Sequence, residues 1–249
     1  MYGTNEKASV LRSAHPTFEV NSIFSTIQGE GPFTGMPAVF VRLAGCNLQC
    51  VFCDTDFGVK DQLTAEQITD LVKRERVSNP GCDLVVLTGG EPLRQYIRPL
   101  VLSLNSYGFR VQVETAGTVW NKDLEDLFDK RGERYPHNTI VCSPKTSSIA
   151  PGIGPYVHAI KYICESGKNC MKDGLPVRNT QRSLLGNQCR VARPAAFGYP
   201  DINHDQILIQ PCDDQDALAK ANNVGAAISV CQRFGYRLSV QTHKVIGVP

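Results

Sequence analysis

The sequence lacks the features that would direct a chain towards a membrane or a nucleic acid. No apolar run approaches the roughly 18 residues of a membrane-spanning helix. The first residues include Glu6, Lys7 and Arg12, where a signal peptide would carry an apolar segment. A total of 26 Lys and Arg against 24 Asp and Glu leaves a net charge of only +2, so no basic excess points to a nucleic acid or a lipid surface. We therefore expect a cytoplasmic protein without a nucleic-acid or membrane partner.

The sequence also lacks the common nucleotide-binding loops, internal repeats and low-complexity tracts. Residues 28–35 read Gln-Gly-Glu-Gly-Pro-Phe-Thr-Gly, which is neither Gly-x-Gly-x-x-Gly nor a loop followed by Gly-Lys-Ser/Thr. Its glycines allow a sharp turn or a close approach of the backbone to a ligand. Taken alone, such a stretch is more often a turn than a site.

The chain, 249 residues and 42% hydrophobic, is large enough for one α/β domain. Apolar alternation and short apolar runs predict strands, and apolar spacing of three and four residues predicts helices. The expected strands cover 18–24, 37–43, 83–87, 109–115, 138–145, 157–163, 206–211 and 237–249, and the expected helices cover 64–77, 99–107 and 213–234, with a short one from Asn121. Polar residues recur where these strands end. We therefore predict a partial (β/α) barrel or open α/β sheet with its site along one rim.

Two segments fall outside this alternation. Residues 1–17 are mixed and polar, and we expect a loosely ordered extension ahead of the domain at 18–249. Residues 165–204 are rich in Gly, Asn, Arg and Pro. An insertion of that length is usually a functional lid or disordered.

Three cysteines with the spacing Cys46-x3-Cys50-x2-Cys53 suggest a metal centre. Cysteine thiolates hold iron–sulfur clusters, and three ligands on a four-iron cluster leave one iron open for a cofactor. Structural zinc is the alternative, in a binding module without catalysis, but zinc takes four ligands and no second cysteine pair of suitable spacing follows. The other seven cysteines are scattered, and most of them are expected to be buried thiols.

The cysteine spacing resembles the signature of the radical S-adenosylmethionine (SAM) superfamily, and residues 88–92, Thr-Gly-Gly-Glu-Pro, resemble its Gly-Gly-Glu-Pro segment. The resemblance implies a partial (β/α) barrel and a [4Fe–4S] cluster on Cys46, Cys50 and Cys53. It also implies that SAM binds the open iron and is cleaved to a 5′-deoxyadenosyl radical. On these two motifs alone, a glycyl-radical activating enzyme is an alternative.

Six motifs in order narrow the resemblance to the 7-carboxy-7-deazaguanine synthases, ring-contracting lyases of queuosine and 7-deazapurine biosynthesis. They lie at 28–31, 42–48, 52–55, 113–115, 143–145 and 241–244, the last with a terminal proline. The resemblance implies conversion of 6-carboxy-5,6,7,8-tetrahydropterin to 7-carboxy-7-deazaguanine and ammonia. It further implies a magnesium requirement, a homodimer and a flavodoxin- or ferredoxin-like electron donor.

The same resemblance assigns roles to individual residues. SAM would be lined by Phe52, Cys53, Asp54, Gly90, Ser143, Pro144 and Lys145. The pterin would be held by Ile27, Gln28, Gly29, Arg42, Thr88, Glu114, His243 and the terminal carboxylate of Pro249. Thr55 resembles the magnesium ligand.

The side-chain chemistry agrees with these roles. The planar guanidinium of Arg42 suits a carboxylate, and the carboxylate of Glu114 can accept two hydrogens from a pterin edge. Without the resemblance, Arg42 could equally extend its head to solvent. Glu114 and His243 could then be ordinary polar residues at strand ends.

Overall fold

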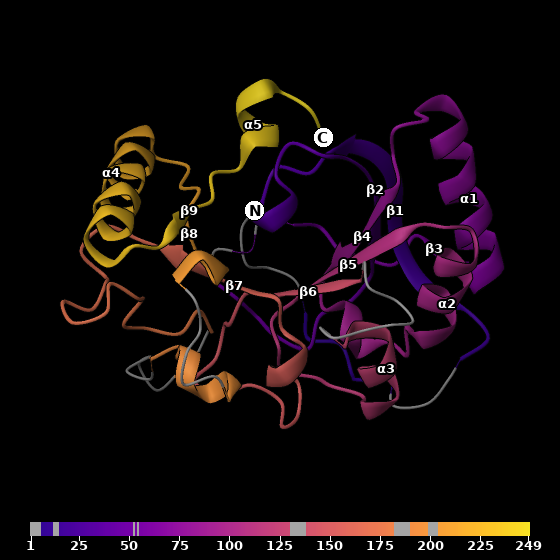
Figure 1. The fold of residues 1–249 in the computed structure, drawn as a ribbon, viewed down its shortest axis with the longest axis horizontal. Helices are drawn as coiled ribbons and strands as arrows, with labels where there is room; N and C mark the ends of the chain where they lie inside the picture. The colour runs from indigo at the N-terminus through magenta and orange to yellow at the C-terminus, as the bar shows by residue number, and fades with distance from the viewer. Residues whose placement is uncertain are drawn as a thin grey trace.

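The structure is a computed structural model that describes residues 6–11, 15–51, 53, 55–129, 138–181, 190–198 and 204–249. Its strands form one sheet in the order β3-β1-β2-β4-β5-β6-β7-β8-β9. Neighbours from β2 to β9 pair in parallel, whereas β1 is antiparallel to both β2 and β3. Figure 1 shows the sheet curving into an open arc, with β3 and β9 at its edges. The predicted partial (β/α) barrel is confirmed.

The elements follow the predicted alternation closely. The strands are β1 (Phe18–Ile27), β2 (Pro37–Leu43), β3 (Asp61–Leu63), β4 (Leu84–Gly89), β5 (Arg110–Thr115), β6 (Thr139–Cys142), β7 (Ala159–Cys164), β8 (Ile207–Pro211) and β9 (Arg237–Leu238). The α-helices are α1 (Ala65–Ser78), α2 (Arg98–Ser106), α3 (Glu125–Phe128), α4 (Ala217–Phe234) and α5 (Thr242–Ile246). Of the strands, only the short β3 had no predicted counterpart.

Local sequence signals set the helix ends. Thr64 and Gln67 form a reciprocal capping box at the start of α1. The Asp216 side chain accepts from the Ala219 amide at the start of α4. Gly235 ends α4 in the left-handed conformation that favours glycine.

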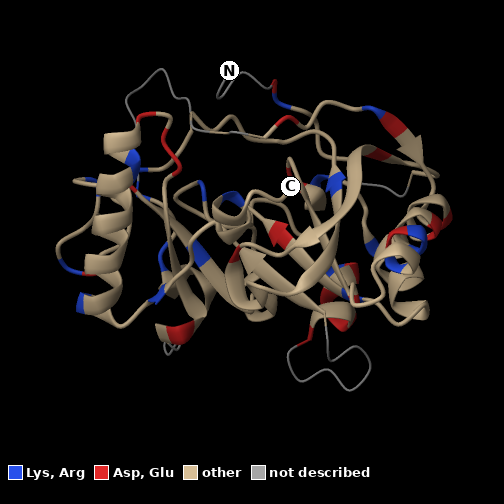
Figure 2. Ribbon diagram, turned by 90° about the horizontal axis from the view of Figure 1, so that it is seen from above, with Lys and Arg blue, Asp and Glu red and all other residues tan. Residues whose placement is uncertain are grey.

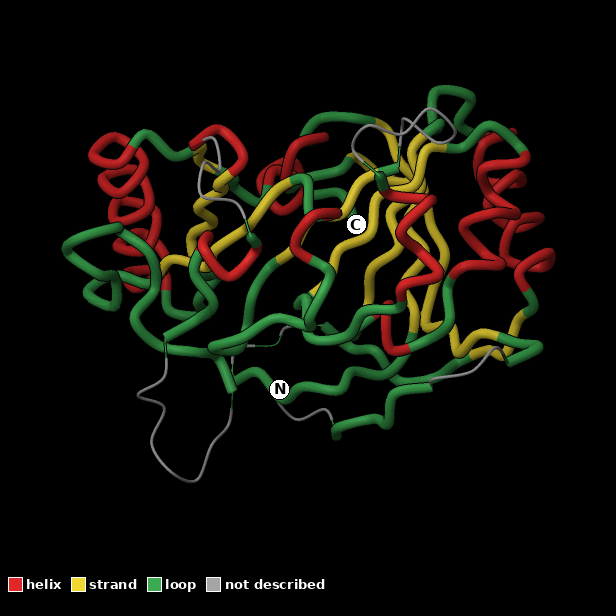
Figure 3. The backbone as a smooth tube through the Cα atoms, turned by 60° about the horizontal axis from the view of Figure 1, so that its bottom comes forward, coloured by secondary structure: helices red, strands yellow, loops and turns green. Residues whose placement is uncertain are grey.

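The alternation along β2 separates a core from a cavity. Val39, Val41 and Leu43 belong to the main apolar core that α1 and α2 also enter. Phe40 and Arg42 point to the other side, where they line a cavity. Figure 3 shows the strands side by side with helices on the outer flanks. The concave side of the sheet therefore carries the polar residues.

The predicted last strand at 237–249 is wrong beyond its first two residues. Pairing with β8 stops at Leu238, and the Thr242 amide then donates to the Gly29 carbonyl at 3.0 Å. The helix α5 follows, and Gly247 caps it at a φ of 73°. Polar and apolar residues alternate along this segment as they do in a strand. Its backbone nevertheless hydrogen-bonds to Gly29, in the loop after β1. Figure 1 shows α5 across the opening of the arc.

Residues 6–11 are attached to the cysteine segment, in contrast to the loose extension that we expected. The Ala8 amide donates to the Cys46 carbonyl at 2.7 Å, and the Leu11 amide donates to the Arg94 carbonyl at 2.8 Å. Buried Arg94 in turn donates to the Ser9 carbonyl at 2.7 Å. Hydrogen bonds between backbone groups do not require particular side chains, so this attachment could not be read from the sequence.

The described parts of the insertion at 165–204 contain no α-helix, and they pack against the domain. Leu175, Val191 and Phe197 are buried members of the main core. The Tyr162 hydroxyl of β7 donates to the Ala192 carbonyl at 2.8 Å. These parts of the segment are therefore an integral layer of the fold.

The surface carries both charge signs. Figure 2 shows Lys and Arg interspersed with Asp and Glu over the molecule, most densely on α1. None of the described helices combines the length and apolarity needed to cross a bilayer.

Candidate functional site

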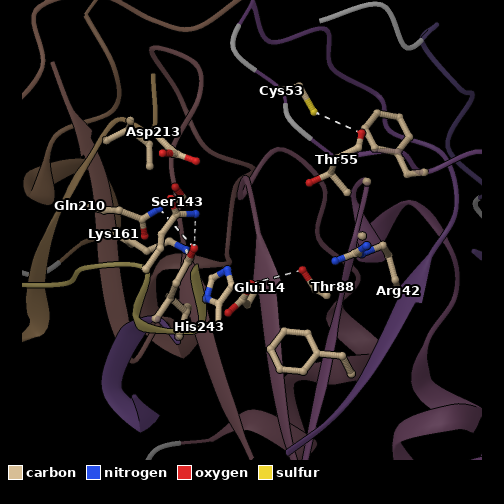
Figure 4. A pocket seen from close by; sticks show the side chains of 18 of the residues that line it. Arg42, Cys53, Thr55, Thr88, Glu114, Ser143, Lys161, Gln210, Asp213 and His243 are labelled. Carbon is tan, nitrogen blue, oxygen red and sulfur yellow. Dashed lines mark hydrogen bonds and ion pairs between the residues drawn. The ribbon is translucent and has the colours of Figure 1, made fainter. Parts of the chain in front are cut away.

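Parallel register brings three polar residues from three strands into one row. Arg42 of β2 pairs with Thr88 of β4, and Leu87 pairs with Val113, so that Glu114 follows beside Thr88. The Thr88 hydroxyl donates to Glu114 Oε2 at 3.2 Å. Figure 4 shows all three side chains facing the same space. The carboxyl ends of the strands thus form the polar rim expected of a parallel α/β fold.

A cavity of about 650 Å³ joins this rim to the cysteine loop. Of the predicted site residues, Ile27, Gln28, Arg42, Cys46, Cys50, Cys53, Thr55, Thr88, Gly90, Glu114, Ser143, Lys145, His243 and Pro249 line it. Gly29 and Pro144 are absent from the lining. Phe52 and Asp54 lie outside the described residues.

The three motif cysteines are half-buried, form no disulfide and line the cavity. Cys46 Sγ accepts from the Leu48 amide at 3.4 Å, and Cys50 Sγ accepts from the Thr180 hydroxyl at 3.0 Å. Hydrogen-bond donors aimed at sulfur suit a thiolate. No three His, Cys, Asp or Glu side chains in the described ranges gather around a single-ion position. A four-iron cluster takes its thiolates on different iron atoms, so the donor set fits such a cluster.

Two glycines let the Gly-Gly-Glu-Pro segment pack directly on the cysteine loop. A Cβ on Gly89, whose φ is 121°, would lie 2.0 Å from the Leu43 carbonyl oxygen. A Cβ on Gly90 would lie 2.0 Å from the Gly45 carbonyl oxygen. The Glu91 amide donates to that same Gly45 carbonyl at 3.0 Å. Only glycine permits this backbone contact.

We expect Gly90→Ala to lower the free energy of unfolding by about 2 kcal/mol, because overpacking against backbone cannot relax by side-chain movement. Iron content after anaerobic reconstitution should fall as well. The matched control is Gly225→Ala in α4, where no atom lies within 4 Å of the added carbon and Ala favours the helix. Denaturant unfolding and iron analysis of both variants test the prediction. Wild-type iron content in Gly90→Ala would contradict it.

Glu91 fixes the relative position of two strand ends. Its buried carboxylate accepts from the Leu93 amide at 3.0 Å, the Thr115 hydroxyl at 2.7 Å and the Ala116 amide at 2.8 Å. Burial raises the pKa of Glu91 to about 7, and the three donors oppose that rise. The ends of β4 and β5 are thereby held together beneath the cavity.

Arg42 carries an unsatisfied donor at the cavity. Its Nε is buried and has no hydrogen-bond partner among the described residues. The guanidinium lies over the Phe24 ring, 5.4 Å from the centroid. A buried donor without a partner costs free energy, so this position suits an anionic ligand group.

Glu114 is held by three donors from different strands and loops. Besides Thr88, Gln28 Nε2 and Gln112 Nε2 each donate to Oε1 at 3.1 Å. The carboxylate is therefore fixed in orientation at the cavity wall.

Comparison with known proteins assigns the family. The radical SAM superfamily model matches residues 41–186. Similar proteins named 7-carboxy-7-deazaguanine synthase occur in Rhodospirillum rubrum, 40% identical over all of both chains, and in Hyperthermus butylicus, 49% identical over 98% of this chain and 97% of the relative. The chain belongs to the 7-carboxy-7-deazaguanine synthase family.

The fold agrees with this family. The crystal structure of QueE from Escherichia coli superposes with a TM-score of 0.61 at 23% identity, over 91% of this chain and 95% of that one. Membership of the radical SAM superfamily implies a [4Fe–4S] cluster and SAM. The zinc-binding module and the glycyl-radical activating enzyme are thereby set aside.

The synthase fold also contains a buried ion pair that sequence reasoning missed. Glu30, after β1, pairs with Lys161 of β7, and both side chains are largely buried. Gln241 Nε2 donates to Glu30 Oε1 at 2.8 Å and Gln210 Nε2 at 3.3 Å. Burial raises the pKa of Glu30, but the Lys161 charge and the donated hydrogen bonds outweigh it and hold the pKa at about 2. A lysine inside an apolar strand was the one available sequence signal.

His243 and Lys145 complete the polar side of the cavity. Gly29 lies against His243 so closely that an added Cβ would be 2.0 Å from Nδ1, so Gly29 contacts a residue that lines the cavity without lining it itself. Burial lowers the pKa of His243. Lys145 Nζ donates to the Ser143 hydroxyl at 2.7 Å, and burial lowers the pKa of this lysine too.

Proposed function

We propose that this protein converts 6-carboxy-5,6,7,8-tetrahydropterin to 7-carboxy-7-deazaguanine with loss of ammonia. One observation carries the proposal: three thiols, an arginine whose buried Nε has no partner among the described residues, and a fixed carboxylate line a single cavity. The names of the relatives support the same reaction.

Arg42 and Glu114 give the cavity its selectivity in this proposal. The guanidinium would hold the 6-carboxylate of the substrate through two parallel hydrogen bonds. Glu114 would accept hydrogens from the amino-imine edge of the pterin ring. Gln28 and Thr88 keep that carboxylate oriented, and Ile27, His243 and Pro249 would bound the ring.

The cofactors would occupy the other side of the cavity. Cys46, Cys50 and Cys53 would hold the cluster, and SAM would lie against Gly90, the 143–145 segment and the 52–54 segment. When bound, these groups would supply the radical chemistry needed to remove a hydrogen atom from C6 of the pterin. The glycine packing described above fixes the backbone of Gly90 for this contact.

Magnesium and two protein partners complete the proposal. Thr55 lies between Cys53 and Arg42 in Figure 4 and lines the cavity. Its hydroxyl is a hard oxygen that suits magnesium together with substrate oxygens and water. We expect a flavodoxin- or ferredoxin-like electron donor and a homodimer.

An anaerobic assay tests the proposal. The reconstituted protein is given SAM, magnesium, dithionite and 6-carboxytetrahydropterin, and the product is identified by ultraviolet absorbance and mass. We expect 7-carboxy-7-deazaguanine without stoichiometric 5′-deoxyadenosine, because SAM is regenerated in each cycle. Cleavage of SAM with an untouched pterin would overturn the proposed substrate, and omitting magnesium tests the magnesium requirement.

A further inference from the structure

The insertion at 165–204 contributes an extended segment to the cysteine loop. Cys50 and Gln181 form an isolated antiparallel β-bridge, and the Val51 amide donates to the Thr180 carbonyl at 3.0 Å. The Gln49 amide donates to Gln181 Oε1 at 3.1 Å. The backbone around Cys50 is thus held by a segment about 130 residues further along the chain.

Two side chains of this segment donate to one sulfur. The Thr180 hydroxyl lies 3.0 Å from Cys50 Sγ, and Gln181 Nε2 lies 3.3 Å from it. The insertion therefore holds the middle cysteine of the motif through side-chain as well as backbone hydrogen bonds.

The Thr180 hydroxyl lies closer to Cys50 Sγ, at 3.0 Å, than to the Lys145 carbonyl oxygen, at 3.4 Å. Thr180 is only 8% exposed, so water competes little for its hydroxyl. Its amide donates to the Lys145 carbonyl at 3.2 Å, which fixes the residue between the cysteine loop and the 143–145 segment. The Asn179 side chain accepts from the Gln181 amide at 3.1 Å and holds the backbone of this segment locally.

We propose that Thr180 and Gln181 are positioning residues for the iron–sulfur cluster, donating hydrogen bonds to the Cys50 thiolate and stabilising the reduced cluster. The inference rests on the proposed cluster site. Reduction adds negative charge that spreads onto the sulfur ligands, so a donor at sulfur favours the reduced state and raises the reduction potential. Partners beyond the direct ligands are a recognised means of tuning a metal centre.

The test is an anaerobic redox titration of the reconstituted holoenzyme, followed by the electron paramagnetic resonance signal of the reduced cluster. Thr180→Val removes the hydroxyl and keeps the shape, whereas Thr180→Ser keeps the hydroxyl. At a fixed potential, we expect Thr180→Val to lower the ratio of reduced to oxidised cluster roughly tenfold, a shift of about 59 mV for one electron. Thr180→Ser should titrate like the wild type, and Gln181→Met should shift in the same direction as Thr180→Val.

The outcomes separate this inference from the proposed function. A wild-type midpoint in Thr180→Val with full iron and sulfide overturns the inference alone, as does an equal shift in Thr180→Ser. Loss of iron from Thr180→Val but not from Thr180→Ser supports it, because the hydroxyl then holds Cys50 in place. If the wild-type protein assembles no four-iron cluster, the proposed function fails and the inference fails with it.

Discussion

Replacing Arg42 with alanine is expected to raise the KM for the carboxylated pterin and to lower kcat/KM roughly 100-fold. A charge-assisted pair of hydrogen bonds to a carboxylate contributes about 3 kcal/mol, and each 1.4 kcal/mol is about tenfold in rate. The buried Nε of Arg42 has no partner among the described residues, so the substituted protein loses no internal hydrogen bond at that atom. Steady-state kinetics of the reconstituted enzyme measure the effect.

Two controls sharpen this test of carboxylate recognition. Arg42→Lys keeps the charge but not the planar fork, and we expect it to recover only part of the loss. Iron and sulfide content should stay at the wild-type level, because Thr55 lies between Arg42 and Cys53 (Figure 4). An unchanged KM in Arg42→Ala would refute the role of this residue.

The second large effect is expected from Lys161→Met, which leaves Glu30 buried without its partner. Removing one member of a buried ion pair typically costs about 3–5 kcal/mol, and we expect that loss in the free energy of unfolding near pH 8. Denaturant unfolding of the reconstituted protein under anaerobic conditions measures it. The double variant Glu30→Gln with Lys161→Met should recover much of the loss, because neither of these two positions then carries a buried charge. A single variant as stable as the wild type would contradict the role of the pair.

The pH dependence gives a second signature of the ion pair. In the wild type, the pKa of Glu30 lies at about 2 instead of the usual 4.5. The stability that ionised Glu30 contributes is therefore complete above pH 4.5 and is lost as the pH falls towards 2. In Lys161→Met, burial dominates and raises the pKa of Glu30, so the destabilisation shrinks on acidification as the carboxyl becomes neutral. The stability difference between the two proteins should narrow between about pH 8 and pH 5.

The loss of Lys161 should also disturb the cavity. Glu30 accepts from Gln210 and Gln241, and Gln241 directly precedes α5, which carries His243. Without Lys161, a buried unpaired carboxylate is unfavourable, so we expect Glu30 to move towards solvent. Its hydrogen-bond partners Gln210 and Gln241 would then shift as well. We therefore expect a lower kcat/KM in the single variant even at temperatures where it stays folded.

The architecture and most of the polar rim could be predicted from the sequence. Strand and helix periodicity, the capping box at Thr64 and the cysteine spacing are local signals, readable without knowledge of the rest of the chain. Arg42, Thr88 and Glu114 were also foreseeable, because the ends of neighbouring parallel strands meet at one edge. The resemblance to the 7-carboxy-7-deazaguanine synthases then suggested that these residues bind a carboxylated pterin.

The contacts between residues that are distant in the sequence could not be predicted and became visible in the folded chain. Glu30 and Lys161 are 131 residues apart and pair because β7 faces the loop after β1. Thr180 reaches Cys50 because the insertion folds back onto the cysteine loop. The 237–249 segment forms α5 because its backbone partner is Gly29 and not a longer β8. Contacts of this kind depend on how the sheet curves and on where the connecting segments pack against it. The periodicity of a short stretch of sequence contains no information about either.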